Sequence, residues 1–194
     1  MIIKSLCSAF HSLNTNVEIL QNWTFPTVST KLKPDDYYLR GVNLFLKSKY
    51  EKAIEAFDKA IELKSDYADP LSYKGAALGK LGKYEDAIEA YDKAIKLKPD
   101  RAGLRFNKGV ALGKLGEYEE AIKAYDEAIE KKSDYADALY NRACLYYAKE
   151  GNEEEALSDL KQTIELDISL KGKAKKDKCF EKLRDDERFK KLVE

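Results

Sequence analysis

The chain has 194 residues, enough for one domain of ordinary size, and its 35 basic residues equal its 35 acidic residues in number. It therefore has no overall positive field that would attract nucleic acid or an anionic membrane. The charge is uneven, however: residues 35–170 carry 22 basic and 28 acidic side chains, whereas residues 171–194 carry 10 and 6. Alanine, leucine, lysine and glutamate dominate, a composition that favours helices over strands.

The residues that most enzyme chemistry requires are scarce. His11 is the only histidine, and the three cysteines, Cys7, Cys144 and Cys179, lack the spacing of a metal site or a disulfide framework. We therefore expect free thiols, a reducing compartment and hence a cytoplasmic location, with no metal or cofactor. No apolar run is long enough to predict a membrane span. Because no nucleophile with a base and no phosphate-binding glycine loop is found, the sequence predicts a protein that is not an enzyme.

Residues 1–33 are predicted to form an N-terminal extension. Its apolar residues recur alternately every three and four positions, as on a helix with a narrow apolar seam: Ile3, Leu6, Phe10, Leu13, Val17 and Leu20. Trp23, Phe25 and Pro26 then favour an extended segment. This extension could cap the structure that follows, or lie in a groove of its own chain or of a second copy, which would give a weak homo-oligomer. A membrane-surface helix is disfavoured because few basic residues flank the seam.

From residue 34 onward the sequence repeats every 34 residues. The string YEKAIEAFDKAIEL begins at Tyr50 and returns as YEDAIEAYDKAIKL at Tyr84 and as YEEAIKAYDEAIEK at Tyr118, with a weaker copy at Asn152. The segments before these strings also repeat, and the apolar residues of the strings step by three and four, so each unit is predicted to contain two helices. The units are residues 34–67, 68–101, 102–135 and 136–168, of which the last is divergent.

Small residues recur at equivalent places of the two helices, where two helix axes could approach closely. These residues are Gly41, Gly75, Gly109 and Ala143 in the first helices and Ala53, Ala87, Ala121 and Ala156 in the second. Gly82 and Gly116 fall in the predicted turns between the helices, where Ser48 replaces glycine in the first unit. Each unit has one apolar face for its partner helix and one for the next unit, so no unit can bury its apolar surface alone.

These positions resemble the tetratricopeptide repeat (TPR) family. The resemblance covers residues 34 to about 168. In all four units it rests on glycine or alanine at the eighth place and alanine at the twentieth. In the first three units it also rests on tyrosine at the seventeenth place, phenylalanine or tyrosine at the twenty-fourth and alanine at the twenty-seventh. It implies an all-α fold, a right-handed superhelical solenoid of antiparallel helix pairs. The seventh place departs from the family because it is basic in every unit: Arg40, Lys74, Lys108 and Arg142. Long basic side chains can lay their stems on apolar surface, so the fold is expected to survive this departure.

Residues 169–194 resemble the charged terminal helices that close such arrays. Phe180, Leu183, Phe189 and Leu192 have helical spacing, and the last helix pair needs a cover with a polar exterior. The basic stretch of residues 171–178 fits the solvated face of such a cap, and contact with nucleic acid or acidic lipid is the alternative.

The family resemblance implies that the first helices line a concave face. Side chains there that suit a peptide or helix of a partner protein are aromatic, aliphatic or amide groups: Tyr38, Val42, Phe45, Tyr73, Phe106, Asn107, Val110, Tyr140, Asn141 and Tyr147. Gly79 and Gly113 would form a low floor between aromatic walls, and a negative rim would come from Asp35, Asp69 and Asp137. The aromatic side chains could instead pack against neighbouring helices, as most helical aromatics do.

The sequence thus predicts a non-catalytic adaptor or scaffold that binds another protein. The family's clamp for the carboxylate of chaperone tails is absent, because Tyr38 and Val42 stand where a lysine and an asparagine would be needed, and Gly103 and Asn107 where a lysine and an arginine would. The alternative is a structural protein that self-assembles through its N-terminal segment or its solenoid ends. The acidic repeats disfavour nucleic acid as a partner. The identity of the partner is not encoded in the repeat.

Overall fold

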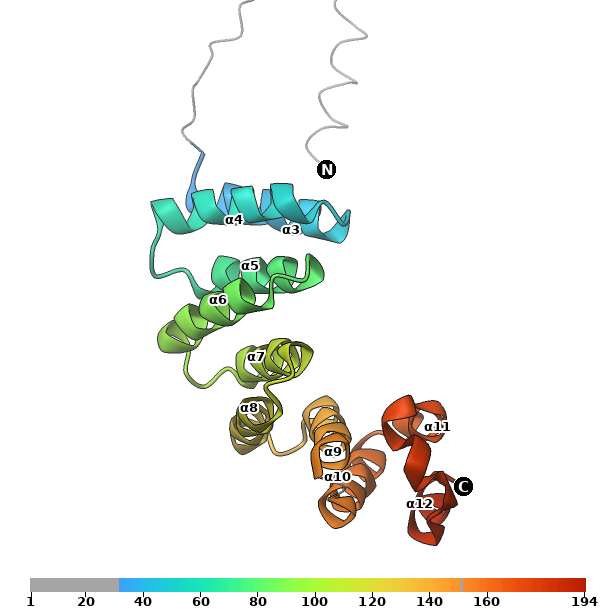
Figure 1. The fold of residues 1–194 in the computed structure, drawn as a ribbon. Helices are drawn as coiled ribbons and strands as arrows, with labels where there is room; N and C mark the ends of the chain where they lie inside the picture. Colours follow the sequence, from blue (N-terminus) through green and yellow to red (C-terminus); the bar gives the residue numbers. More distant parts are fainter. Residues whose placement is uncertain (1–31, 151) are drawn as a thin grey trace, which may run out of the picture. The chain divides into compact units, whose positions relative to one another are not determined.

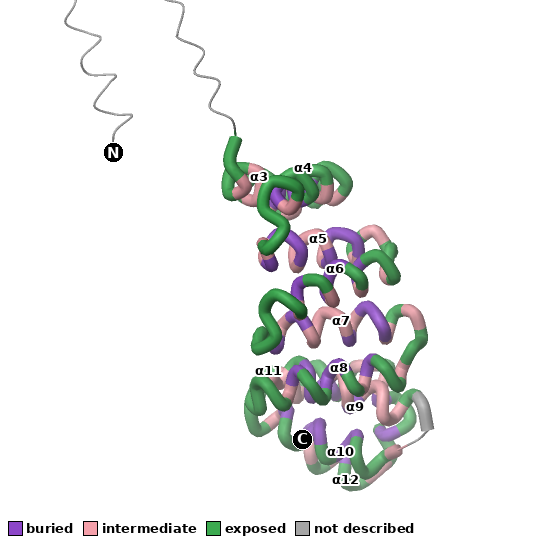
Figure 2. Tube along the Cα trace, turned by 90° about the vertical axis from the view of Figure 1, so that its left-hand side faces the viewer, coloured by how far each residue is buried: buried purple, intermediate pink, exposed green. Residues whose placement is uncertain are grey.

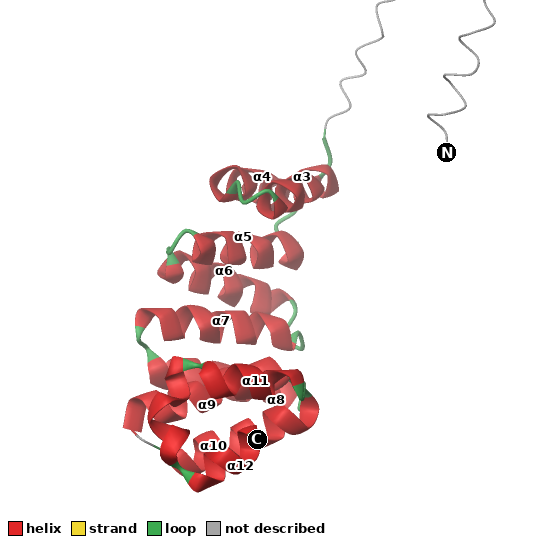
Figure 3. Cartoon of the chain, turned by 90° about the vertical axis from the view of Figure 1, so that its right-hand side faces the viewer, coloured by secondary structure: helices red, strands yellow, loops and turns green. Residues whose placement is uncertain are grey.

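A computed structural model describes residues 32–150 and 152–194, in which Lys33–Glu194 form one compact unit. The predicted helix and extended segment of the N-terminal extension lie outside the described residues. Within the described part of the chain every regular element is a helix and no strand occurs (Figure 1; Figure 3). None of these helices is both long and apolar enough to span a membrane.

Eight helices form four consecutive pairs (Figure 1). They are α3 (Pro34–Leu46) with α4 (Tyr50–Leu63), α5 (Ala68–Lys80) with α6 (Tyr84–Leu97), α7 (Ala102–Leu115) with α8 (Tyr118–Lys131), and α9 (Ala136–Glu150) with α10 (Glu153–Leu166). Each second helix packs on its own partner, α4, α6 and α8 also pack on the first helix of the next pair, and successive first helices touch. The prediction of an all-α solenoid of stacked antiparallel helix pairs is confirmed.

The second helices show how the sequence produces this stack. In α4 the buried residues are Ala53, Ala56, Phe57 and Ala60, which step by three and four and so lie on one face. The same places are buried in α6 and α8. Figure 2 shows buried residues spread along the whole row of helices, with no single central core. Such burial is expected where each unit covers its neighbour.

The eighth-place glycines are required by close approach of an aromatic ring. A Cβ atom added to Gly109 would lie 2.7 Å from Cε1 of Tyr125, and one added to Gly75 would lie 2.8 Å from Cε1 of Tyr91. The ring of Phe57 crosses Gly41 in the same way. The repeated pairing of glycine with a ring therefore sets the distance between the two helices of a unit.

The turns inside the units use left-handed backbone conformations. Gly82 has a φ of 76° and Gly116 a φ of 83°, which glycine adopts without steric cost. Ser48 stands at this place in the first unit with a φ of 56°. The turn keeps its hydrogen bond, since the N–H of Lys49 donates to the carbonyl of Leu44 at 2.9 Å, but the conformation is unfavourable for a residue with a side chain.

The basic residues at the seventh place form ion pairs between units. In the second, third and fourth units this residue contacts the aspartate 16 residues earlier, on the second helix of the preceding unit: Lys74 with Asp58 at 2.5 Å, Lys108 with Asp92 at 2.7 Å and Arg142 with Asp126 at 2.5 Å. Arg142 also donates two hydrogen bonds, both 2.7 Å long, to Asp159 of α10, which is only 6% exposed. This departure from the family pattern thus joins neighbouring units.

The C-terminal segment covers the last pair with three short helices, α11 (Ser169–Lys176), the 3₁₀ helix η1 (Lys178–Asp185) and α12 (Glu187–Val193). Phe180, Leu183 and Phe189 are buried together with Val193, whereas Leu192 is half-buried. They form one cluster with side chains of α9 and α10. The predicted capping helices are confirmed, although the chain bends twice where a single helical stripe would run straight.

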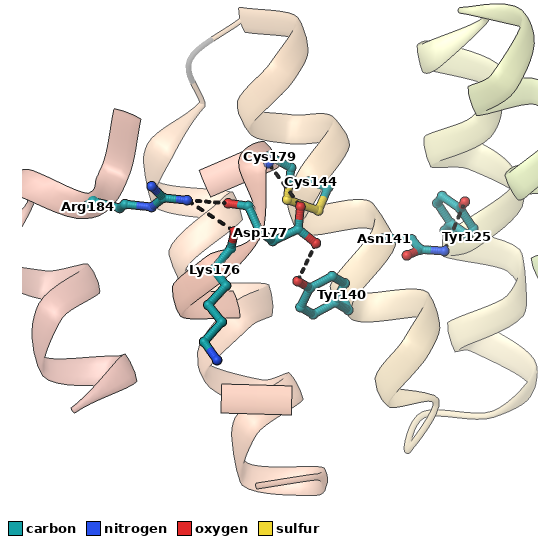
Figure 4. The surroundings of a disulfide bond; sticks show 8 residues. All are labelled: Tyr125, Tyr140, Asn141, Cys144, Lys176, Asp177, Cys179 and Arg184. Carbon is teal, nitrogen blue, oxygen red and sulfur yellow. Dashed lines mark hydrogen bonds between the residues drawn. A yellow bond between two sulfur atoms is a disulfide. The ribbon is translucent and has the colours of Figure 1, made fainter. Parts of the chain in front are cut away.

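The expectation of free thiols is wrong for two of the three cysteines. Cys144 of α9 and Cys179 of η1 form a disulfide across 35 residues of sequence (Figure 4). Their spacing in the sequence gave no sign of this bond, because it depends on how the cap folds back on α9. Since disulfides persist in oxidising compartments, the argument from free thiols to a cytoplasmic location loses its basis.

Candidate functional site

Two adjoining hollows lie along the first helices. The first, of about 320 Å³, lies between α5 and α7 and has an apolar lining with one amide and two lysines: Ala76, Gly79, Lys80, Tyr84, Tyr91, Phe106, Asn107, Val110, Ala111 and Lys114. The second, of about 220 Å³, lies between α7 and α9 and shares Val110 and Lys114 with the first. We call the two hollows together the inner groove.

Four of the predicted site residues line the inner groove: Phe106, Asn107, Val110 and Asn141. All four are half-buried, so each has surface left for a ligand. Gly79 and Gly113 also line it. No heavy atom lies within 4 Å of the place where a side chain on Gly79 would begin, so the space above Gly79 is open.

The groove side chains are held by their neighbours. The Phe106 ring lies 5.0 Å from the ring of Tyr135 and 5.9 Å from that of Tyr125, measured between centroids. The Nδ2 of Asn141 donates to the Tyr125 hydroxyl at 3.4 Å, which leaves the amide oxygen of Asn141 for other partners. Burial raises the pKa of Tyr125 to about 12, so this hydroxyl stays neutral at physiological pH. These contacts fix the side chains before any ligand arrives.

The predicted aromatic residues of the first unit pack mostly against one another. Tyr73 of α5 lies 5.8 Å from Tyr38, 5.9 Å from Phe45 and 5.8 Å from Phe57, in each case between ring centroids. Val42 and these rings, apart from the buried Phe57, are half-buried. They therefore join α3 to α5, which is the packing role that the sequence left open.

Tyr140 does not lie open in the groove, so its prediction as a contact residue needs correction. It is 2% exposed, and its hydroxyl donates to Asp177 at 2.8 Å (Figure 4). Its ring lies edge-on to Phe180 with centroids 5.6 Å apart. Burial and the hydrogen bond to Asp177 raise its pKa well above the ordinary value. Tyr147 packs on the same cluster under the cap. The cap thus covers the face of α9 that the sequence assigned to a ligand.

One acid of the predicted negative rim, Asp69, is neutralised by two basic partners. Asp69 accepts hydrogen bonds from Arg101 and, at 3.3 Å, from Lys98. Burial acts to raise the pKa of Asp69, but these two partners outweigh it and the pKa is lowered. Asp35 accepts a hydrogen bond from the hydroxyl of Tyr67 at 2.8 Å. The positions of these acids are visible in the sequence but their partners are not, because the partners lie about 30 residues further on, at the end of the same unit.

Comparisons with known proteins agree with this geometry. Models of the tetratricopeptide repeat match residues 74–136 and 111–169, and a further TPR model matches residues 41–82. A search of curated proteins finds no match. Among solved structures, MamA is 26% identical with a TM-score of 0.69, and the match covers 79% of this chain and 92% of that one.

Two further structures carry a description of binding. YrrB, described as a TPR protein with an unusual peptide-binding site, is 29% identical with a TM-score of 0.63, over 70% of this chain and 69% of that one. The first TPR of Spaghetti (RPAP3), bound to the HSP90 peptide SRMEEVD, is 22% identical with a TM-score of 0.59, over 60% of this chain and 92% of that one, and so shows the fold alone. With matches that run together from residue 41 to residue 169, the chain belongs to the tetratricopeptide repeat family, whose members are generally non-catalytic interaction modules.

Proposed function

We propose that this protein is an interaction scaffold that binds an extended segment of a partner protein along the inner groove. The observation that carries the proposal is the pair of adjoining hollows between α5, α7 and α9, which share Val110 and Lys114. Here the open floor at Gly79 leaves room for a side chain of the partner.

The lining suits a polypeptide. Phe106 and Val110 offer apolar surface to a side chain, while the amides of Asn107 and Asn141 can donate to and accept from the backbone of an extended peptide. The descriptions of YrrB and of the peptide-bound RPAP3 repeat support a peptide as the ligand class for this fold. The family therefore provides the shape, and these four side chains provide the contacts.

The proposal is tested by filling the hollow from its floor. Binding heptapeptides are selected from a random display library with the full chain, and their dissociation constants are then measured by fluorescence anisotropy with Gly79→Leu. The matched control is Gly172→Leu, which adds the same side chain to another helical glycine with no heavy atom within 4 Å of its Cβ position.

We expect Gly79→Leu to weaken peptide binding at least tenfold, because the added side chain occupies the space a ligand needs, while Gly172→Leu leaves it unchanged. Circular dichroism checks that both variants remain helical. Equal affinity of Gly79→Leu and the parent chain would rule out this groove, and so would the failure to select any peptide. Sedimentation of the chain with and without residues 1–33 shows whether mass grows with concentration, as the alternative of self-assembly requires.

A further inference from the structure

The hollow between α5 and α7 differs in charge from the hollows lined by the second helices. Its lining contains two lysines, Lys80 and Lys114, and no acidic residue. Two other hollows lie against the second helices and have balanced charges. One combines Lys74 and Lys93 with Asp86 and Glu89, and the other combines Arg105, Lys108 and Lys123 with Asp92, Glu120 and Glu127.

Most cations around the balanced hollows already have acidic partners. Lys108 contacts Asp92 at 2.7 Å, Arg105 contacts Glu127 at 2.9 Å, and Lys123 contacts Glu120 at 2.6 Å. Lys80 and Lys114, by contrast, are exposed and form no ion pair with any residue in the described part of the chain. An anionic ligand would therefore meet two free ammonium groups in the inner groove and mostly neutralised cations in the two balanced hollows.

The two lysines are equivalent residues of neighbouring units. Both lie in the last turn of a first helix, Lys80 in α5 and Lys114 in α7. A lysine there also complements the negative end of the helix dipole, which explains the charge but not the lack of acidic residues around the hollow. Because α5 and α7 are in contact, their axes are about 10 Å apart, which an extended peptide crosses in about three residues.

We propose that the groove binds an acidic peptide segment in which two carboxylates, about three residues apart, contact Lys80 and Lys114. A bulky apolar side chain between the carboxylates enters the hollow beside Phe106 and Val110. The inference rests on the proposed function and names the chemistry of its ligand. Nucleic acid is a poorer match, because a phosphate backbone needs a longer row of cations than two lysines on repeats with an excess of acidic residues.

Three labelled hexapeptides test the inference by fluorescence anisotropy: ADLFDA, its neutral counterpart ANLFNA and its basic counterpart AKLFKA. They are titrated with the parent chain and with the charge-reversed variant Lys80→Glu/Lys114→Glu. The matched control is Lys93→Glu/Lys96→Glu, which changes the net charge equally at two exposed residues of α6 that do not line the groove. Lys80→Arg/Lys114→Arg keeps the charge and should keep the binding.

We expect the parent chain to bind ADLFDA at least tenfold more tightly than ANLFNA, with a preference that weakens as salt is added. The charge-reversed variant should lose this preference and bind AKLFKA best, while the control variant behaves like the parent. Equal binding of ADLFDA and ANLFNA, or equal losses in both double variants, would overturn the inference and leave the proposed function standing. If none of the hexapeptides binds and display selects no peptide, both fail. Displacement of ADLFDA by single-stranded RNA at equal concentration would also overturn the inference.

Discussion

The substitution Gly109→Ala tests whether a ring sets the spacing of the helices in each unit. The added Cβ would lie 2.7 Å from Cε1 and 2.9 Å from Cδ1 of Tyr125. This ring is 3% exposed and packs against Phe106, so it cannot move away from the new Cβ without disturbing its neighbours. Overpacking of this kind costs about 1 to 3 kcal/mol.

Gly79→Ala is the matched control, because it makes the same change in a helix where the new Cβ meets no heavy atom within 4 Å. Replacing glycine by alanine inside a helix stabilises it by about 0.8 to 1 kcal/mol. This gain is common to both variants and cancels when they are compared. Their unfolding free energies should therefore differ by the clash alone, about 1 to 3 kcal/mol, with Gly79→Ala more stable than the parent chain.

Thermal unfolding followed by circular dichroism at 222 nm measures the difference. A domain of this size shifts its Tm by about 2 to 4 °C for each kcal/mol, so the two variants should differ by about 2 to 12 °C. If Gly109→Ala raises the Tm as much as Gly79→Ala does, the ring gives way freely and the close approach does not fix the helix spacing.

Three further predictions concern single side chains. Ser48→Gly puts a residue without a Cβ into the left-handed conformation at φ 56° and should raise the urea midpoint by an amount equal to about 1 kcal/mol; no change would mean that serine adopts this turn without cost. Arg142→Ala leaves Asp159 buried without its bidentate partner and should lower the free energy of unfolding in urea by about 3 to 5 kcal/mol. Lys74→Ala, whose partner Asp58 is half exposed, should lower it by less than about 1 kcal/mol. Similar losses in the two variants would contradict this difference. Burial raises the pKa of Tyr91 to about 12 from an ordinary value near 10. The neutral hydroxyl therefore contributes its full stability below pH 10, and roughly 2 to 3 kcal/mol of the free energy of unfolding is lost as the pH rises through 12. Tyr91→Phe should lose less stability over this pH range.

Much of the fold could be predicted because the same buried residues recur at equivalent places in successive units. Gly75 and Gly109 recur 34 residues apart, and each meets a ring that recurs at the same interval, so the buried face of every unit follows from one. The ion pairs between units were also within reach of the sequence. Asp58, for example, recurs with its partner Lys74 at the same period of 34 residues, so the two positions could be paired from the sequence. The prediction for the basic residue covers only the packing of its side-chain stem on apolar surface.

The groove could be predicted only where the repeat continues. Phe106 and Val110 line it because units follow on both sides, whereas Tyr140 faces a segment that does not repeat. No pattern in the sequence shows that Cys179 and Asp177 fold back onto α9, since the path of the cap depends on the shape of the surface beneath it. Charge patterns had the same limit, because the partners of Asp69 lie about 30 residues away at the end of its own unit and come close only when the helix pair is folded.

The disulfide between Cys144 and Cys179 determines how a pulling force passes through the cap. A force applied at the C-terminal end passes from η1 directly into α9, so that α10 and α11, which lie inside the covalent ring, carry none of the extension. The 35 residues between the two cysteines would add about 120 Å of contour length only after reduction. Pulling on the two ends of the chain under oxidising conditions would therefore extend α12 and the repeats before Cys144, while the residues between the two cysteines stay in one closed loop.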